Sequence, residues 1–399
     1  MIERLQISNL RNLTQVDLQS AVCNLIIGAN GSGKTSLLEA IFLLSRGKSF
    51  RHHQPKRYIQ HHQNATTVHA KLNDDSTLAI QKQADATTLL RLNQTTVYNQ
   101  SILTEQLPTL LIDPSTMDML EQGSASRRQL LDWLVFHMKQ GFHPQWVAYQ
   151  RLLKQRNSLL KKAQHLTQVQ LAELRSWDKG LSNHAALIHH YRKQVFTEWQ
   201  PYFAKSIVQL LPEYAEQLSL SYSAGYDTSV ALDIQLNERL EQDLQLGYTR
   251  IGNHRADIHV YWRSDDDKST PSSEYADSSD MIKPKALKEQ AANVLSRGEK
   301  KLLITALRLS QLPLLLESKA EAMSTHNDLS TKATPVVLLD DVTAELDNRA
   351  IQILLSTLAQ LPCQVFISSL TDDIVPLIKD LWPHPIVFHM KQGQISSFS

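Results

Sequence analysis

The chain's glycines concentrate at one place, where they lead into a lysine. Three of its 12 glycines lie between positions 28 and 33, within Gly-Ala-Asn-Gly-Ser-Gly-Lys-Thr. This segment fits the phosphate-binding pattern G-x-x-x-x-G-K-[ST]. Glycine permits positive φ and brings backbone N–H groups close to phosphate oxygens, the lysine reaches the β- and γ-phosphates, and the threonine hydroxyl binds Mg²⁺. The predicted nucleotide-binding residues are Gly28, Ala29, Asn30, Gly31, Ser32, Gly33, Lys34 and Thr35.

Two adjacent acids follow an apolar run near the other end of the chain. Pro335-Val-Val-Leu-Leu-Asp340-Asp341 reads as a buried strand that ends in two carboxylates. Asp340 is predicted to hold Mg²⁺ together with Thr35, and Asp341 to orient and deprotonate the attacking water. Taken alone, the run could equally be a strand followed by an acidic turn. Together with the glycine loop it indicates a catalytic site of Lys34, Asp340 and Asp341.

A third motif, Leu295-Ser-Arg-Gly-Glu-Lys300, precedes a helical run. Ser296 and Glu299 have the spacing of a capping box, which is a purely local interpretation. A helix N-terminus also presents free N–H groups to anions. In ABC-type ATPases an S-x-G at such a position contacts the γ-phosphate held by the opposite subunit. The order of the three motifs favours this role for Ser296 and Gly298.

The elements that must position these residues follow from the hydrophobic pattern. A buried strand over 22–27 and a helix over 36–45 flank the glycine loop. Alternation over 66–99 predicts hairpins, and 107–115 predicts a strand. A helical region is expected over 124–215, broken near Gly141, Pro144, Pro201 and Pro212. Strand-like segments follow over 216–262 and a polar loop over 264–285. A helix is expected over 296–316, and a polar stretch over 317–334.

The distance between the motifs indicates the domain organisation. Lys34 and Asp340 lie 306 positions apart (340 − 34). An α/β nucleotide head assembled from both ends of the chain, with a helical insertion, explains this distance. The predicted parts are 1–113 with the phosphate loop, 114–215 as a helical lobe, and 216–399 as the completion of the head. The insertion is too short and too interrupted by proline for long antiparallel coiled coils.

Composition excludes several classes of protein. The 399 residues carry 41 Lys and Arg against 40 Asp and Glu, for a net charge of +1, so any basic surface must be local. Two cysteines suit a reducing cytosol. The N-terminus lacks the apolar core of a signal peptide, and no apolar stretch is long enough to span a membrane. A cytoplasmic protein without a membrane segment is expected.

One predicted helix carries a basic face. Residues 133–172 contain no acid, and at 100° per residue the side chains of Arg151, Lys154, Lys161 and Lys162 fall within an arc of about 100°. This face is either a solvated side of an amphipathic helix or a surface that contacts DNA phosphates without sequence preference. Four histidines over 52–62 match no zinc pattern and are expected to be solvated.

Family-specific segments accompany these motifs in order. They are ISNLRN, GANGSGKTSLLEA, GKSFR, IDPS followed by SRRQLLDW, HRAD, LSRGEKK and VVLLDDVTAELD. The chain resembles the RecF family of bacterial DNA replication and repair proteins, which have an ABC-type ATPase head akin to SMC proteins. The resemblance implies ATP and Mg²⁺ as cofactors and an ATP-driven homodimer on DNA. It also implies action with RecO and RecR at single-strand gaps and stalled forks, where RecA displaces single-strand-binding protein. Ser296 and Gly298 would contact nucleotide in trans, and Asp347 matches the D-loop at the dimer contact.

The sequence departs from the expected pattern at three places. Ser368 and Ser369 stand where most ABC ATPases have a histidine near the γ-phosphate. Asp341 replaces the more usual glutamate, which predicts slow hydrolysis. Asn253 stands where proline is expected. Two other interpretations stay open: an ABC ATPase subunit that powers a transporter, and a small-molecule kinase.

Overall fold

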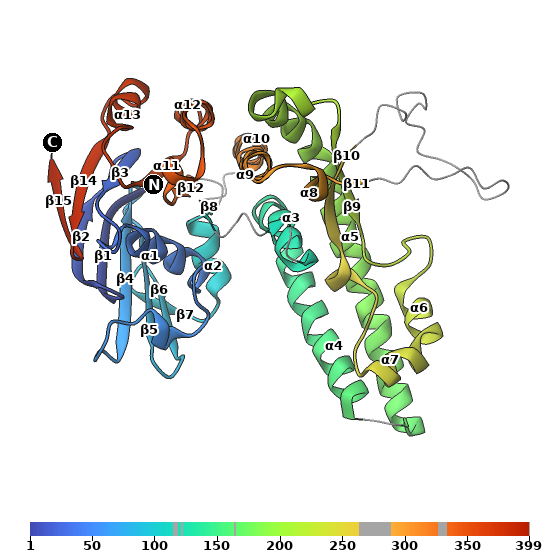
Figure 1. The fold of residues 1–399 in the computed structure, drawn as a ribbon. Coiled ribbons are helices and arrows are strands. Elements are labelled where there is room, and N and C mark those ends of the chain that lie inside the picture. Colours follow the sequence, from blue (N-terminus) through green and yellow to red (C-terminus); the bar gives the residue numbers. More distant parts are fainter. Residues whose placement is uncertain (115–118, 121–122, 163–164, 263–288, 326–332, 399) are drawn as a thin grey trace. The chain divides into compact units, whose positions relative to one another are not determined.

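The computed structural model describes residues 1–114, 119–120, 123–162, 165–262, 289–325 and 333–398. The chain forms two compact units (Figure 1), one of residues 1–117 with 316–399 and one of residues 118–315. The first unit brings the two ends of the chain together, as the separation of Lys34 and Asp340 predicts.

An antiparallel six-stranded sheet forms one layer of the first unit, with strand order β2-β1-β4-β5-β6-β7. Its strands are β1 (Ile2–Leu10), β2 (Leu13–Gln19), β4 (Ala65–Leu72), β5 (Thr77–Gln83), β6 (Thr88–Leu92) and β7 (Thr95–Val97). Every second side chain of β4 is buried, because successive residues of a strand point to opposite faces. The hairpins predicted over 66–99 are confirmed.

A second sheet, of order β15-β14-β3-β13-β12-β8, carries the phosphate loop and the acid pair. Its strands are β3 (Cys23–Ile27), β8 (Thr109–Ile112), β12 (Val336–Leu339), β13 (Gln364–Ser369), β14 (Ile386–Lys391) and β15 (Gln394–Phe398). All neighbours pair in parallel except β14 and β15. The phosphate loop follows β3 and the two acids follow β12. Because carboxyl ends of parallel strands meet at one edge, the pairing brings the two motifs together.

Helix α1 (Lys34–Arg46) packs against strands of both sheets and shares their apolar core. It begins two residues earlier than predicted. The other helices of this unit are η1 (Pro55–Arg57), α2 (Gln100–Gln106), α11 (Val342–Glu345), α12 (Asn348–Ala359) and α13 (Val375–Leu381). Among the residues described, no helix combines the length and the apolar character needed to cross a membrane.

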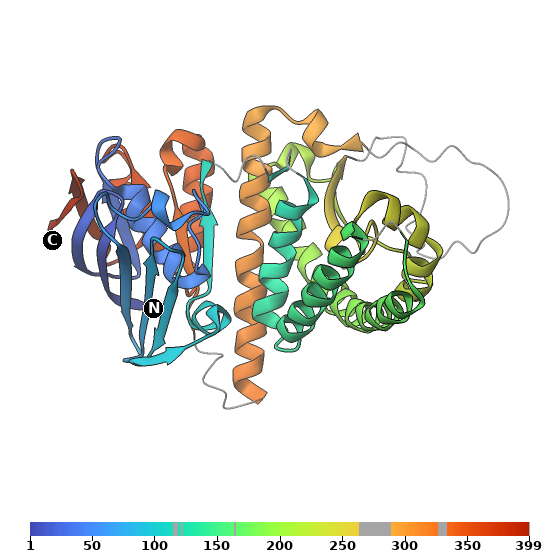
Figure 2. The same ribbon diagram turned by 90° about the horizontal axis from the view of Figure 1, so that it is seen from below.

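Long helices dominate the second unit. They are α3 (Ser124–Met138), α4 (Phe142–Lys162), α5 (Gln168–Leu210) and α9 (Arg297–Leu309); α10 (Gln311–Thr325) crosses into the first unit. Helices α4 and α5 lie side by side in both views (Figures 1 and 2). The sheet β11-β10-β9 and several short elements complete the unit. They are η3 (Pro212–Tyr214), β9 (Leu218–Ser223), α6 (Leu232–Glu238), α7 (Leu240–Leu246), η4 (Asn253–Arg255), β10 (Asp257–Trp262), β11 (Glu289–Gln290) and α8 (Ala291–Val294).

Several local expectations about this region were wrong. The break near Gly141 is confirmed, but Pro144 lies in the first turn of α4, where proline needs no hydrogen-bonded N–H. Helix α5 continues through Pro201, and the buried side chains of Trp199 and Phe203 on either side of the proline outweigh the lost backbone bond. Two helices, α6 and α7, lie within the region expected to be strands, and 317–325 is helical. The loop predicted over 264–285 lies outside the described residues.

The chain divides differently from the expected boundaries. Residues 216–315, expected in the nucleotide head, belong to the same unit as the helical lobe. The reason is packing: β9 and α9 both contact α5.

Arginines join the family-specific segments within this unit. The Arg127 guanidinium binds both oxygens of Asp257 at 2.9 and 2.8 Å, and Arg128 donates to the Ala256 carbonyl at 2.6 Å. Arg192 donates to Asp132 and to the Asn253 carbonyl. Asn253, at the expected proline, donates its amide to the Ala185 carbonyl at 2.7 Å, a bond that proline could not make. The SRR and HRAD segments are therefore packed against each other.

Candidate nucleotide-binding site

The phosphate loop has the backbone that its glycines predict. Gly31 and Gly33 have φ values of 77° and 117°, in the left-handed region that favours glycine. At Gly28, a Cβ atom would lie 2.4 Å from the Met390 carbonyl oxygen. The loop ends at the N-terminus of α1, where free N–H groups and the helix dipole favour an anion.

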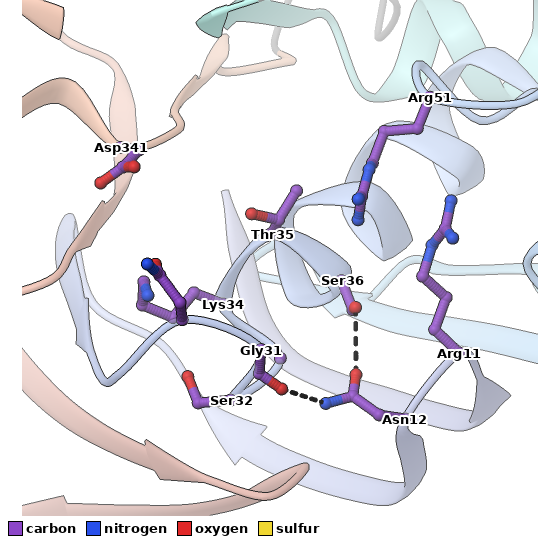
Figure 3. Close-up of a pocket in the computed structure, with 11 residues that line it drawn as sticks. Arg11, Asn12, Gly31, Ser32, Lys34, Thr35, Ser36, Arg51 and Asp341 are labelled. Atoms are coloured by element: carbon purple, nitrogen blue, oxygen red, sulfur yellow. Dashed lines mark hydrogen bonds between the residues drawn. The ribbon is translucent and has the colours of Figure 1, made fainter. Parts of the chain in front are cut away.

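A pocket of about 380 Å³ opens over this loop. Figure 3 shows Asp341 on one side of it and Arg11 and Arg51 on the other. It is lined by Arg11, Asn12, Asn30, Gly31, Ser32, Gly33, Lys34, Thr35, Ser36, Arg51 and Asp341. Three cations and a row of backbone amides suit a polyphosphate.

Lys34 lies almost buried at the floor of the pocket. Its ammonium donates to the carbonyls of Gly28 at 2.6 Å and Ala29 at 3.2 Å. Burial lowers the pKa of Lys34, and the carboxylates of Asp341 and Asp340 oppose this shift. The side chain is placed to exchange these carbonyls for phosphate oxygens.

Thr35 and Asp340 meet as the motifs predict. The Thr35 hydroxyl donates to Asp340 Oδ1 at 3.0 Å, across 305 positions of sequence. Burial raises the pKa of Asp340; hydrogen bonds from Ser368 and Thr35 oppose this, and the charges of Asp113 and Asp341 add to it. A hydroxyl and a carboxylate in contact are the hard oxygen donors that Mg²⁺ takes beside phosphate oxygens, so these two residues fit the metal.

Asp341 has an unusual backbone. Its φ is 51°, left-handed for a residue with a side chain, and it is the N-cap of α11. Its Oδ1 is buried and has no hydrogen-bond partner among the described residues. An unpartnered carboxylate oxygen beside the lysine is suited to accept a proton from water.

Ser368 connects the two acids. Its hydroxyl donates to Asp340 Oδ1 at 2.8 Å and accepts the Asp341 N–H at 2.8 Å. Ser369, next in β13, donates to the Thr371 carbonyl instead. At the position where a histidine is usual, Ser368 thus orients the acid pair, and Ser369 holds the loop that follows β13.

Sequence reasoning missed several residues around the site. Arg11 forms an ion pair with the fully buried Glu39, which also accepts a hydrogen bond from the Ser49 hydroxyl. Ser49 in turn accepts the Arg51 N–H at 3.0 Å. These residues lie in ISNLRN, SLLEA and GKSFR, family-specific segments whose pattern assigns them no role. The one available signal in the sequence was that each of these segments contains a charged residue, either arginine or glutamate.

The signature residues lie in the second unit. Ser296 caps α9: its N–H donates to Glu299 at 2.7 Å and its hydroxyl accepts the Glu299 N–H at 3.4 Å, which confirms the capping box. Gly298 is exposed, and no atom lies within 4 Å of the position that a Cβ would occupy there. In the first unit, Asp347 is exposed and caps α12 by accepting the Ala350 N–H at 2.8 Å.

The basic face on α4 is confirmed as a surface. Its four cations, Arg151, Lys154, Lys161 and Lys162, are all exposed. Leu153 and Leu160 are buried against the rest of the unit. The amphipathic pattern therefore holds, while the role of the face stays a prediction.

Comparison with known proteins decides the family. The family model described as RecF/RecN/SMC N terminal domain matches residues 1–384. A protein of Acinetobacter baumannii strain SDF named DNA replication and repair protein RecF is 39% identical over 397 residues, 99% of this chain and 98% of that protein. The protein of that name from Cellvibrio japonicus is 35% identical, over 99% of both chains. This chain belongs to the RecF family.

Solved structures agree on the RecF-family fold. A solved structure of the recombination mediator protein RecF-ATP in the RecFOR pathway superposes with a TM-score of 0.78 at 22% identity, covering 100% of this chain and 97% of that one. An Smc head bound to the C-terminal winged-helix domain of ScpA gives 0.54 at 13% identity, covering 100% and 97%. The predicted fold class, a mixed α/β ABC-type head with an inserted lobe, is confirmed, and the transporter interpretation is not favoured.

Proposed function

We propose that this RecF-family chain is an ATP-dependent, DNA-binding mediator of repair and recombination in the cytoplasm, acting at single-strand gaps and stalled forks. The observation that carries the proposal is the meeting of Thr35 and Asp340 at 3.0 Å beside the phosphate loop. Family membership supplies the biological context, including RecO and RecR as partners and support of RecA loading.

In the proposed reaction, the loop amides and Lys34 bind the phosphates, and Thr35 with Asp340 hold Mg²⁺. When bound there, Mg²⁺ would supply positive charge to offset that of the β- and γ-phosphates. Asp341 orients a water and accepts its proton at Oδ1, while the water oxygen bonds to the γ-phosphorus and the bond to the β-phosphate oxygen breaks, giving ADP and phosphate. Arg11 and Arg51, across the pocket from Asp341, stabilise negative charge on the transferred group.

Hydrolysis is expected to be slow, and to serve as a switch. The aspartate at position 341 is one methylene shorter than glutamate, so its carboxylate sits farther from the water. Turnover of tens per second by the purified protein, with or without DNA, would refute this part of the proposal.

The nucleotide would also join two copies. Ser296 and Gly298 of one copy would approach the γ-phosphate held by the phosphate loop of the other, and Asp347 would lie at the contact. The exposed N-terminus of α9 has room for a phosphate at Gly298. ATP binding would then assemble the homodimer and hydrolysis would release it.

DNA is proposed to bind the basic face of α4 and a neighbouring loop. This loop, residues 247–252, lies beside α4. The Thr249 hydroxyl accepts a hydrogen bond from Arg156 and donates one to Asn157 Oδ1, and both partners belong to α4. Within HRAD, Arg255 is exposed and lies over the Tyr248 ring at 5.6 Å. Arg255 is therefore a second candidate phosphate contact, and a dimer would align two sets of such cations and raise affinity through effective concentration.

Sedimentation velocity tests the proposal directly. The protein is run with and without ATP and Mg²⁺, with and without a gapped duplex, and alongside Lys34→Arg. We expect a dimer only with ATP, stabilised by the gapped DNA and lost in Lys34→Arg. A monomer under all conditions would indicate a kinase instead, and an ATP-dependent dimer indifferent to DNA would contradict the DNA-binding part.

A further inference from the structure

The turn of the C-terminal hairpin touches the phosphate loop from about 360 positions away. Gln392 and Gly393 join β14 to β15 with φ values of 50° and 78°, as a two-residue hairpin turn requires. The Gly393 N–H donates to the Ser32 carbonyl at 2.8 Å. All three residues belong to the first unit.

The contact leaves no space for a side chain. A Cβ atom on Gly393 would lie 2.1 Å from the Asn12 carbonyl oxygen. The Asn12 amide in turn donates to the Gly31 carbonyl at 3.0 Å, and its oxygen accepts the Ser36 hydroxyl at 3.1 Å. The hairpin turn, Asn12 and the phosphate loop are therefore packed against one another.

The bond to Ser32 determines where the next amide points. In a planar trans peptide the C=O of one residue and the N–H of the next point in opposite directions. Because the Ser32 carbonyl is held by Gly393, the Gly33 N–H points away from the hairpin. Gly33 lines the nucleotide pocket, so its N–H is one of the amides available to phosphate.

The rest of the hairpin supports the same loop. The Met390 carbonyl lies where a Cβ on Gly28 would clash, and the Met390 sulfur lies 3.0 Å from the corresponding position on Gly33. Beside these contacts lies a cavity of about 660 Å³, lined by the loop and by residues of β14 and β15. The loop can thus shift into open space where Met390 and Gly393 do not hold it.

We propose that Gly393 is a positioning residue of the nucleotide site, which holds the phosphate loop in its anion-binding shape through the Ser32 carbonyl. This inference rests on the proposed binding of ATP. It makes the C-terminal hairpin a part of the site, although none of its side chains lines the pocket over the loop.

Gly393→Ala tests the proposal against a matched control, Gly247→Ala. Gly247 has a φ of 75°, and a Cβ there would have no neighbour closer than 3.6 Å. Both variants carry the backbone cost of a left-handed alanine, and only Gly393→Ala also displaces the turn. Calorimetric titration with ATP and thermal unfolding are measured for both.

We expect Gly393→Ala to weaken ATP binding by on the order of tenfold, the loss of one amide bond to a charged group, and Gly247→Ala to leave affinity unchanged. Equal ATP affinity of folded Gly393→Ala and wild type would overturn the proposal.

If Gly393→Ala does not fold, hydrogen exchange of the wild type tests the inference instead. ATP must slow exchange in residues 390–398, and unchanged exchange there would overturn the inference. Failure of the wild type to bind ATP would contradict the proposed function and this inference together, whereas a normal wild type with an unaffected Gly393→Ala contradicts the inference alone.

Discussion

At the scale of residues, Ser368 links the two acids of the site, because its hydroxyl donates to Asp340 Oδ1 and accepts the Asp341 N–H.

Ser368→Ala removes the hydroxyl that joins Asp340 to the Asp341 backbone. Because Asp341 then loses the bond to its N–H, we expect ATP hydrolysis to slow by about tenfold or more, while affinity for ATP without Mg²⁺ stays unchanged. Steady-state hydrolysis and calorimetric titration measure the two effects.

The control for this change is Ser45→Ala, which removes another fully buried hydroxyl, one that donates to the Leu107 carbonyl at 2.6 Å. It is expected to lower thermal stability without altering hydrolysis. Ser368→Thr, which keeps the hydroxyl, should restore activity. Normal hydrolysis in Ser368→Ala would show that the acids need no such support.

Asp341→Asn separates binding from chemistry. The amide cannot accept the proton of water, so hydrolysis should fall by at least about a hundredfold while ATP still binds. Nucleotide binding is followed by calorimetry and phosphate release by a coupled assay. Residual hydrolysis near the wild-type rate would assign the proton to another group.

The part of the site that the sequence predicts consists of residues adjacent in the chain. The phosphate loop and the acid pair each carry their chemistry in a short run, so their residue types and spacing predict it. Arg11, Ser368 and Gly393 reach the site from separate strands and turns, and their roles arise only from contacts between distant segments. Local sequence pattern contains no signal for such contacts.

At the scale of elements, periodicity predicts the strands and most helices, because one buried face repeats along each of them. It misplaces the end of α5, where the core contacts of Trp199 and Phe203 override the helix-breaking tendency of Pro201. It also misses α6 and α7, which are short helices between strands. The HRAD segment carries the family resemblance in the sequence, yet its contacts with Arg127 and Arg128 have no signal there.

His254, in the HRAD segment, is expected to make the stability of the second unit sensitive to acid. Burial lowers the pKa of His254 to about 4, and the ordinary value of 6.5 applies on unfolding. As pH falls below 6.5 the unfolded chain binds the proton first, so stability is lost between pH 6.5 and 4. Between pH 7 and pH 5, this difference in proton binding lowers the free energy of unfolding by about 2 kcal/mol.

Urea denaturation at pH 7 and pH 5 checks this expectation. His254→Gln should lose about 2 kcal/mol less than wild type over the same interval, since it removes the titrating group. Equal losses in the two proteins would show that His254 is not the group responsible.

The basic face of α4 makes a prediction about salt. Lys154→Glu with Lys161→Glu should weaken binding to gapped duplex and lower the slope of log affinity against log salt by roughly one per lost phosphate contact. Lys193→Glu with Lys205→Glu, an equal charge reversal at exposed positions of α5, serves as the control. Fluorescence anisotropy over a salt series gives both quantities, and an unchanged slope would exclude the face.

At the scale of the whole molecule, the chain divides its proposed functions between two units. The phosphate loop and the acids lie in the first unit, and Ser296 and the basic helix lie in the second. If ATP joins the first unit of one copy to the second unit of another, its binding and hydrolysis would control how two DNA-binding surfaces are held together. The sequence predicted that the head is built from both chain ends, but not that residues 216–315 belong to the other unit.

Mixing two inactive variants tests this shared site most directly. Lys34→Ala impairs the phosphate loop, and Ser296→Arg blocks the helix that the loop would face on a second copy. In a mixed dimer one of the two composite sites keeps both Lys34 and Ser296, so equimolar mixing should restore ATP hydrolysis to about a quarter of the wild-type rate. No recovery on mixing, or full activity of Ser296→Arg alone, would contradict a nucleotide held between two copies.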